Sequence, residues 1–343
     1  MDRKQLGVCV VGAGMMGQNH TRAWAGVPEA RLVAVADVDL ERAQALKQDH
    51  GFERLYADYR EALDSADVDV VSVCVPAYYH PEVTIFAAER GKHVLCEKPI
   101  ALSVERAQAM IAAARSNDVR LGIGFQLRHL QTTREIRRLL REQAIGRPVM
   151  WAYSYPMSIR PKAAMHDMLR GNGGPVVDFC PHRFDLWRTC FESEPVQVQA
   201  QVLTFASGRP EFAGIEQFAP DTVSLMVRYQ SGDIGSITIT WGLPPGVSGQ
   251  SQAEIWGAKG LIQAGTDQLR LLTEGRDEVT LGPYGQDPMT EAMQLQAQSF
   301  ARAVTEGTEP TVTGEDGLAA LRVSLAAIRS AQSGQPVDPR EVS

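Results

Sequence analysis

Several features that would place this 343-residue sequence in other classes of protein are missing from it. Its five cysteines form no Cys-x-x-Cys pair, and their odd number argues against a disulfide framework or a zinc site and favours a reducing compartment. No apolar run is long enough to span a bilayer. The N-terminus shows neither the long apolar region nor the small-residue cleavage site of a secretory signal. A cytoplasmic location is therefore expected.

Basic clusters are also missing. The formal net charge is -7, and no run of Lys or Arg stands out, so we expect neither a nucleic-acid nor a membrane partner. The composition is ordinary for a globular protein, with 44% hydrophobic and 22% charged residues. The length is sufficient for two packed cores.

The first third of the chain alternates strand and helix patterns. Strands buried on both faces read as near-continuous apolar runs, and such runs recur between helical segments. The predicted strands are Leu6–Val11, Leu32–Asp37, Val68–Val75, Lys92–Cys96 and Leu121–Phe125. Predicted helices follow them, through Trp24, at Leu40–Lys47, at Pro81–Arg90 and at Ser103–Ser116, with Ser103 as N-cap. This alternation predicts a doubly wound parallel sheet of the Rossmann type over residues 1–124.

A glycine-rich turn lies between the first strand and the first helix. Gly12, Gly14 and Gly17 have the G-x-G-x-x-G spacing in the strand-to-helix context that dinucleotide binding requires. Gly12 permits the tight turn, Gly14 the approach of a pyrophosphate, and Gly17 close packing of helix on strand. Met15 and Met16 complete the turn, and we expect them to border the cofactor. The N–H groups at the helix N-terminus would face its phosphates.

An acidic residue ends the second strand. Asp37 lies 20 residues after Gly17, where a carboxylate binds the ribose hydroxyls of the cofactor. A carboxylate there repels a 2′-phosphate, so NAD is favoured over NADP. Arg42, the nearest cation, is expected to point to solvent. The alternative is a structural glycine turn with a surface Asp, and the register of strand, glycines, helix and acid disfavours it.

Another strand ends on Glu97-Lys98-Pro99, at the carboxyl edge of the sheet where ligands of open α/β sheets bind. A lysine in this place can donate a hydrogen bond to a reacting oxygen and stabilise developing negative charge. Pro99 restricts Lys98 to an extended conformation. From these residues alone, an exposed loop lysine beside a turn proline is an equal alternative.

The run VCVPAYYH, from Val73 to His80, followed by GKHVLCEKP, resembles the glucose–fructose oxidoreductase / inositol dehydrogenase / MocA family. That family has a Thr-Pro-Asn-like turn, a His, and then G-K-H-V-x-x-E-K-P. Pro76 and His80 match, whereas Ala and Tyr occupy the rest of the turn. The resemblance implies that Val75, Pro76 and His80 border the cofactor. It also implies that Glu97 lies near the nicotinamide ribose and that Lys98 contacts substrate and assists catalysis.

The chain changes character after about residue 124. Residues 125–343 are predicted to form an α+β domain with a large, mostly antiparallel sheet, one face of which is covered by helices. Strands are predicted at Val149–Tyr155, Val196–Phe205, Thr222–Tyr229 and Ile234–Trp241, with weaker candidates at Ala253–Trp256 and Leu269–Leu272. Helices are predicted at Gln131–Arg141, Glu291–Val304 and Glu315–Gln332.

The family pattern returns at residues 171–182, GNGGPVVDFCPH, which resembles G-G-G-x-(apolar)-x-D-x-G-x-H. Asp178 and His182 occupy the family's two catalytic positions, and Cys180 stands where glycine is usual. Positions i and i+4 share a helix face, and Pro181 suits a first helical turn. His182 would then lie near a helix N-terminus, where positive potential disfavours imidazolium and preserves a general base. An N-capping Asp with a packed His is the alternative.

The resemblance implies oxidation of a secondary alcohol of a sugar, inositol or related polyol by hydride transfer to NAD. His182 would accept the hydroxyl proton, Asp178 would orient, and Lys98 would stabilise the oxygen. Arg128 and Arg160 are further candidates for substrate contact. No metal site is expected. An NAD-dependent glycosidase and a non-catalytic nucleotide- and sugar-binding sensor are alternatives within the same family. An exposed sheet in the second domain needs covering, so a homodimer or homotetramer through that sheet is expected.

Overall fold

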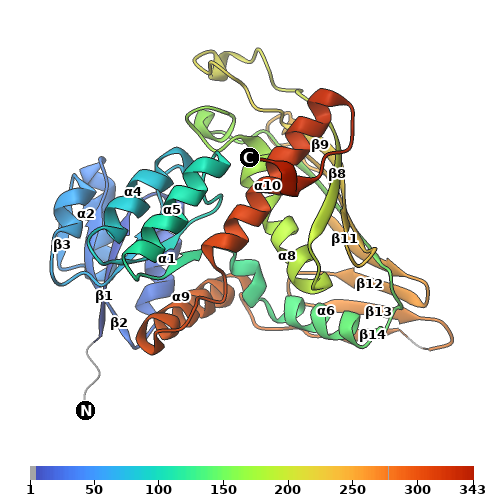
Figure 1. The fold of residues 1–343 in the computed structure, drawn as a ribbon, viewed down its shortest axis with the longest axis horizontal. Coiled ribbons are helices and arrows are strands. Elements are labelled where there is room, and N and C mark those ends of the chain that lie inside the picture. Colours follow the sequence, from blue (N-terminus) through green and yellow to red (C-terminus); the bar gives the residue numbers. More distant parts are fainter. Residues whose placement is uncertain (1–4, 277) are drawn as a thin grey trace. The chain divides into compact units, whose positions relative to one another are not determined.

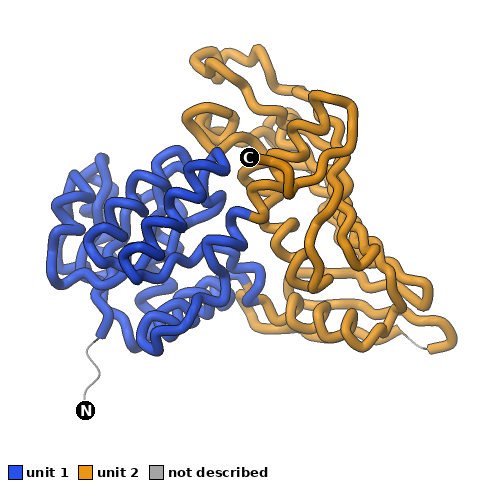
Figure 2. Tube along the Cα trace, viewed as in Figure 1, with its two compact units in different colours: residues 1–129, 289–318 blue, residues 130–288, 319–343 orange. Residues whose placement is uncertain are grey.

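The computed structural model describes residues 5–276 and 278–343 (Figure 1). The chain divides into two compact units (Figure 2). The first runs to His129 and takes in Met289–Leu318, and the second consists of Leu130–Pro288 and Ala319–Ser343. The sequence predicts a first domain of residues 1–124 alone, whereas residues 289–318 also belong to the first unit.

The first unit is built on a parallel sheet with the strand order β3-β2-β1-β4-β5-β6. Its strands are β1 (Leu6–Val11), β2 (Ala30–Ala36), β3 (Arg54–Tyr56), β4 (Val70–Val73), β5 (His93–Cys96) and β6 (Leu121–Ile123). Helices connect them: α1 (Met15–Ala25), α2 (Leu40–His50), α3 (Tyr59–Leu63), α4 (His80–Ala88) and α5 (Val104–Ser116). The predicted Rossmann architecture is confirmed, and Ser103 caps α5 by accepting from Arg106 N–H.

Helix α9 (Pro288–Glu306) joins the first unit although it lies more than 150 residues from the parallel sheet in sequence. Met293, Ala297 and Phe300 belong to the same buried core as Val8 and Val10 of β1. Burial of an amphipathic helix face against a sheet needs no proximity in sequence. The core of the first unit is therefore completed by a distant segment.

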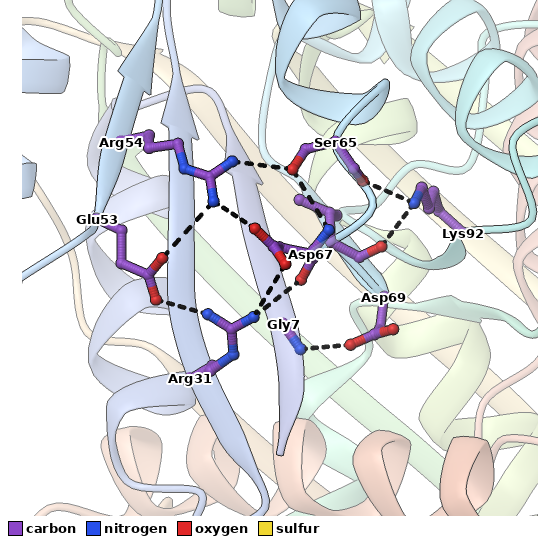
Figure 3. Close-up of polar contacts among 9 residues, drawn as sticks. Gly7, Arg31, Glu53, Arg54, Ser65, Asp67, Asp69 and Lys92 are labelled. Atoms are coloured by element: carbon purple, nitrogen blue, oxygen red, sulfur yellow. Dashed lines mark hydrogen bonds and ion pairs between the residues drawn. The ribbon is translucent and has the colours of Figure 1, made fainter. Parts of the chain in front are cut away.

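A polar cluster fastens the amino ends of the parallel strands (Figure 3). Asp69 accepts a hydrogen bond from Gly7 N–H at 2.7 Å, and Lys92 Nζ donates to the carbonyl oxygens of Ser65 and Val68. Nearby ion pairs join Arg31 with Glu53, and Arg54 with Asp67. These groups lie at the edge opposite the carboxyl ends of the strands, so they serve the fold rather than the ligand-binding edge.

The second unit is built on an eight-stranded sheet with the order β14-β13-β12-β11-β7-β10-β9-β8. Its strands are β7 (Met150–Ser158), β8 (Pro195–Leu203), β9 (Thr222–Tyr229), β10 (Ile234–Leu243), β11 (Gln252–Gly257), β12 (Gly260–Ala264), β13 (Leu269–Thr273) and β14 (Val279–Leu281). Neighbouring strands are antiparallel except β7 and β10, which are parallel. The predicted mostly antiparallel sheet is thus confirmed.

Helices accompany the sheet of the second unit: α6 (Gln131–Arg141), α7 (Gly174–Asp178), α8 (Pro181–Phe191) and the later part of α10 (Gly314–Ser333). Helix α8 packs directly on β10, since a side chain on Gly235 would meet the ring of Trp187 at 2.2 Å. In β9 Leu225 and Val227 are buried whereas Met226 and Arg228 are exposed. The sheet therefore has one covered and one open face. No helix among the described residues combines the length and apolar character needed to cross a membrane.

Candidate functional site

The three glycines of the β1–α1 turn occupy different environments. Gly12 has φ +100, and Gly17 approaches it so closely that a Cβ would lie 1.9 Å from the Gly12 carbonyl oxygen. Among the described residues, a Cβ on Gly14 would meet nothing within 4 Å. Gly14 also precedes α1 without a side-chain cap, which leaves the first N–H groups of the helix available to an anion. The turn therefore offers an open cradle for a pyrophosphate, bordered by the exposed Met15.

Asp37, at the end of β2, is joined to the glycine turn. Its Oδ2 accepts from Ala13 N–H at 2.6 Å and its Oδ1 from Asp39 N–H at 2.8 Å. A carboxylate has about four lone-pair sites, so two backbone bonds leave capacity for ribose hydroxyls. Arg42 pairs with Asp39 at 2.9 Å and is mostly exposed. The local charge at this strand end is therefore negative, which opposes a 2′-phosphate and fits NAD.

His80 joins the turns that follow β4 and β5. Its Nδ1 lies 2.8 Å from the Pro99 carbonyl oxygen and its Nε2 lies 2.9 Å from that of Val75. The side chain is buried, and burial lowers the pKa of His80 although the two carbonyls oppose this. Both ring nitrogens face backbone oxygens. We therefore interpret His80 as a group that sets the Val75-Pro76 turn, rather than one that itself contacts the cofactor.

Glu97 directly follows the carboxyl end of β5 and precedes Lys98, and its side chain is buried. Its Oε1 lies 2.8 Å from His20 Nε2, and its Oε2 accepts from Lys98 N–H at 3.2 Å. Burial opposes ionisation, but His20 and nearby cations lower the pKa of Glu97 below its usual value. Lys98 is half-buried. The sequence did not single out His20, and the signal was its position three residues after Gly17, on the buried face of α1.

In the second unit, the catalytic candidates lie on two short helices rather than one. Asp178 is the last residue of α7, and His182 is the second residue of α8. The prediction that Asp178 and His182 share one helix face is therefore wrong. His182 does lie at a helix N-terminus, as predicted. Both side chains are largely buried, at 5% and 9% exposure, and Asn172 Nδ2 donates to Asp178 Oδ1 at 3.4 Å.

Aromatic rings and guanidinium groups surround this helix pair. Phe179, between the two helices, stacks on Tyr155 with a 4.6 Å centroid separation. Arg183 lies 4.0 Å from the Tyr153 ring centroid and donates to its hydroxyl at 2.7 Å. Arg160 lies over the ring of Trp241 at 5.2 Å. This arrangement can present planar apolar surface and hydrogen-bond donors to a hydroxylated ligand.

Comparison with known proteins identifies the architecture. A family model described as "Oxidoreductase family, NAD-binding Rossmann fold" matches residues 6–125, and one described as "GFO/IDH/MocA C-terminal domain" matches residues 133–263. The chain is 31% identical to the inositol 2-dehydrogenase of Rhizobium meliloti, covering 94% of this chain and 95% of that protein. The chain belongs to the Gfo/Idh/MocA family of oxidoreductases.

Other Gfo/Idh/MocA members match over equally large parts of the chain. The myo-inositol 2-dehydrogenase of Thermotoga maritima is 29% identical, covering 97% of this chain and 98% of that one. A solved structure of levoglucosan dehydrogenase with NADH and levoglucosan has a TM-score of 0.88 at 25% identity and covers 98% of this chain and all of the other. The protein is therefore an NAD-dependent oxidoreductase of this family.

Arg128 has structural partners that the sequence did not predict. Arg128 pairs with Asp316 at 3.0 Å and donates to the Thr311 carbonyl oxygen, and its side chain is only 11% exposed. This ion pair accounts for Arg128 without a substrate contact. Cys180 is fully buried, and burial raises the pKa of its thiol, which fits an unreactive packing residue. Within the described ranges, no three His, Cys, Asp or Glu side chains form a metal-binding group.

Proposed function

We propose that the protein is an NAD-dependent dehydrogenase that oxidises a secondary alcohol of a sugar, an inositol or a related polyol. The observation that carries the proposal is the pair of Asp178 and His182 at the junction of α7 and α8, in a chain that matches inositol dehydrogenases over nearly its full length. Such a pair supplies a general base and a carboxylate that orients it. Bound NAD would supply the hydride acceptor.

The proposed roles follow from the chemistry of each side chain. His182 accepts the hydroxyl proton, and the positive potential at the start of α8 favours the neutral imidazole that this requires. Asp178 orients the base or the substrate hydroxyl. Lys98 donates to the reacting oxygen and stabilises its developing negative charge. We propose that Arg160 contacts a further substrate oxygen. The reverse reaction, reduction of a carbonyl, uses the same groups.

The proposed cofactor contacts extend from the glycine turn to the end of β5. Gly12, Gly14 and Gly17 receive the pyrophosphate, and Asp37 receives the ribose hydroxyls. The remaining contacts are proposed for Met15, Met16, Val75, Pro76, Glu97 and Lys98. Here the sequence prediction is retained for every residue except His80, whose ring nitrogens face backbone carbonyls.

Incubating the protein with NAD and a panel of inositols, sugars and sugar acids tests the activity. We expect NADH absorbance to rise with at least one member of the panel. A glycosidase that only passes through an oxidised state would instead release the leaving group of a nitrophenyl glycoside with no net NADH. A sensor would bind NAD by calorimetry and do neither. Either of these results would replace the dehydrogenase assignment.

Replacing Asp37 by serine is expected to shift cofactor preference. Removing the carboxylate deletes both the ribose contact and the repulsion of a 2′-phosphate, so the ratio of NADP to NAD dissociation constants should fall about tenfold or more. Asp39→Asn is the matched control, because Asn retains the N-cap of α2 while removing a nearby charge. Calorimetric titration with both cofactors measures the ratio. An unchanged ratio in Asp37→Ser would refute the ribose role.

We further propose that the open face of the eight-stranded sheet forms a homodimer or homotetramer interface. Gln199, Met226, Ser236 and Ala152 lie side by side across β8, β9, β10 and β7, and none carries a charge. Although Arg228 lies on the same face of β9, this uncharged row favours an interface between copies of the chain.

A charge placed on this face is expected to weaken the assembly. Light scattering after size-exclusion chromatography should show an oligomer for the wild type and smaller species for Met226→Glu. Leu295→Glu, the same apolar-to-acidic change at an exposed position of α9, should leave the mass unchanged. A monomeric wild type would contradict the proposed interface.

A further inference from the structure

A buried polar group lies under the Glu97-Lys98 strand end, and the proposed reaction does not use it directly. His20 extends from the inner face of α1, with Nδ1 2.7 Å from Ser72 Oγ on β4 and Nε2 2.8 Å from Glu97 Oε1. Trp24, one turn further along α1, donates its indole N–H to the same Ser72 oxygen at 3.1 Å. All four side chains are almost completely buried. A single imidazole therefore connects α1, β4 and the end of β5.

The connection is ionic as well as geometric. Burial lowers the pKa of His20, but Cys74 and Glu97 more than offset it, and the pKa of His20 is raised to about 10. Lys98 and His80 also face Glu97 and favour its ionised form, whereas the Cys96 thiol, whose own pKa is raised by burial, is neutral. A buried carboxylate without a close cation is strongly destabilising. His20 supplies that cation at hydrogen-bonding distance.

The Glu97 carboxylate is held in place on several sides, so a change at His20 that moves it would also move Lys98. A Cβ on Gly124 would lie 2.8 Å from Glu97 Oε1, so the side chain packs against backbone on that side. Glu97 N–H donates to the Val73 carbonyl at 2.9 Å, and Glu97 Oε2 accepts from Lys98 N–H. The Lys98 backbone is therefore fixed by a carboxylate whose own orientation depends on His20.

We propose that His20 is a positioning residue that sets Lys98 for catalysis through the Glu97 carboxylate. The inference rests on the proposed role of Lys98 in the dehydrogenase reaction. His20 itself is buried and contacts neither substrate nor the reacting atoms. Its loss would leave Glu97 without its closest cation and the end of β5 free to shift. Displacement of a catalytic group by about 1 Å can cost about 10²-fold in rate.

The principal variant is His20→Gln, with His93→Gln as the matched control. His93 lies at the opposite end of β5, where its Nδ1 accepts from Arg120 N–H. In His20→Gln we expect kcat to fall by up to about 10²-fold, with the KM for substrate nearly unchanged. NAD affinity should fall by a much smaller factor, because Glu97 and Lys98 are also proposed cofactor contacts. The double variant His20→Gln/Glu97→Gln also removes the Glu97 charge that His20→Gln leaves without its closest cation. The increase in activation free energy of the double variant should therefore be smaller than the sum of the increases in the two single variants. Ser72→Ala removes only one hydrogen-bond partner of His20, so it should lower kcat by a smaller factor, again with little change in KM.

Two further readouts do not depend on activity. The rate at which Lys98 is acetylated by limiting acetic anhydride, referenced to the exposed Lys259 in the same sample, should change in His20→Gln and stay at the wild-type value in His93→Gln. The second readout is the pH dependence of the melting temperature. A raised histidine pKa contributes stability that is complete below about pH 6.5 and is lost as the pH rises through about 10. The melting temperature of the wild type should therefore exceed that of His20→Gln most near pH 6, and the difference should shrink toward pH 10.

Wild-type Lys98 labelling and wild-type kcat in a folded His20→Gln protein would overturn the proposal. So would a melting difference that is constant between pH 6 and 10, because it would show a neutral packing role. If none of the compounds in the panel supports NAD reduction by the wild type, the dehydrogenase assignment fails. The labelling and melting measurements then still decide whether His20 controls the position of Lys98.

Discussion

Alanine at Lys98 or at His182 is expected to lower kcat by about 10²–10⁴-fold while NAD affinity stays within a few fold for His182→Ala. His182 lies at the start of α8 and Lys98 follows the buried end of β5. In the proposed mechanism His182 accepts a proton and Lys98 stabilises the reacting oxygen, so each variant would remove a group that acts on the transition state. Steady-state kinetics on the best substrate of the panel provide the measurement.

Matched substitutions separate chemistry from general damage to the fold. Lys259→Ala and His50→Ala change the same residue types in the second and first units, and neither side chain is placed at the site. Both should retain wild-type kcat and melting temperature. If His182→Ala keeps full activity, the general base is a different group, and if Lys98→Ala keeps it, the oxygen is stabilised elsewhere.

Alanine at Gly17 should destabilise the protein and alanine at Gly14 should not, although both residues lie in the same turn. The new methyl group at Gly17 would lie 1.9 Å from the Gly12 carbonyl oxygen, so α1 must shift, at a cost of about 1–3 kcal/mol in unfolding free energy. The methyl group at Gly14 meets no atom of the residues that the structure describes within 4 Å, and the φ of -70 there suits alanine. Gly14→Ala should therefore melt like the wild type.

NAD binding distinguishes the two variants further. The open space above Gly14 is where a pyrophosphate would approach the backbone, so Gly14→Ala should weaken NAD about tenfold or more without loss of stability. Gly17→Ala should lose both stability and affinity, because the turn itself is displaced. Calorimetric titration with NAD and thermal unfolding without it give the two quantities. Unimpaired NAD binding by Gly14→Ala would show that the cofactor does not use this cradle.

The sequence predicted the parallel sheet because its signals are local. Valine-rich runs, a glycine turn and a serine cap each identify an element within a few residues, and β1 and the cap at Ser103 were confirmed. The short strands β3, β12 and β14 were missed, because three to five residues without a strong apolar pattern acquire strand geometry only from a neighbouring strand. The return of α9 to the first unit depends on packing with β1, which no local pattern records.

Candidate site residues could be named from the sequence, but their local geometry could not. The motif singled out Asp178 and His182 as candidates and did not predict the separation of α7 from α8. Helix α7 ends at Asp178 with Phe179 as its C-cap, and Pro181 begins the new helix α8 after Cys180. His20 was missed because its position three residues after Gly17 does not show that the fold brings Glu97, 77 residues away in sequence, into contact with it. Partners distant in sequence likewise explain Arg128.

Hydride transfer itself can be followed with a polyol, such as an inositol, that carries deuterium at its carbinol carbons. The protein is incubated with this compound and NAD, and the reduced cofactor is analysed by mass spectrometry. The proposed dehydrogenase predicts reduced cofactor that carries one deuterium, in an amount equal to the ketone formed. Reduced cofactor without deuterium, or turnover of the polyol with no reduced cofactor at all, would contradict hydride transfer from a secondary alcohol to NAD.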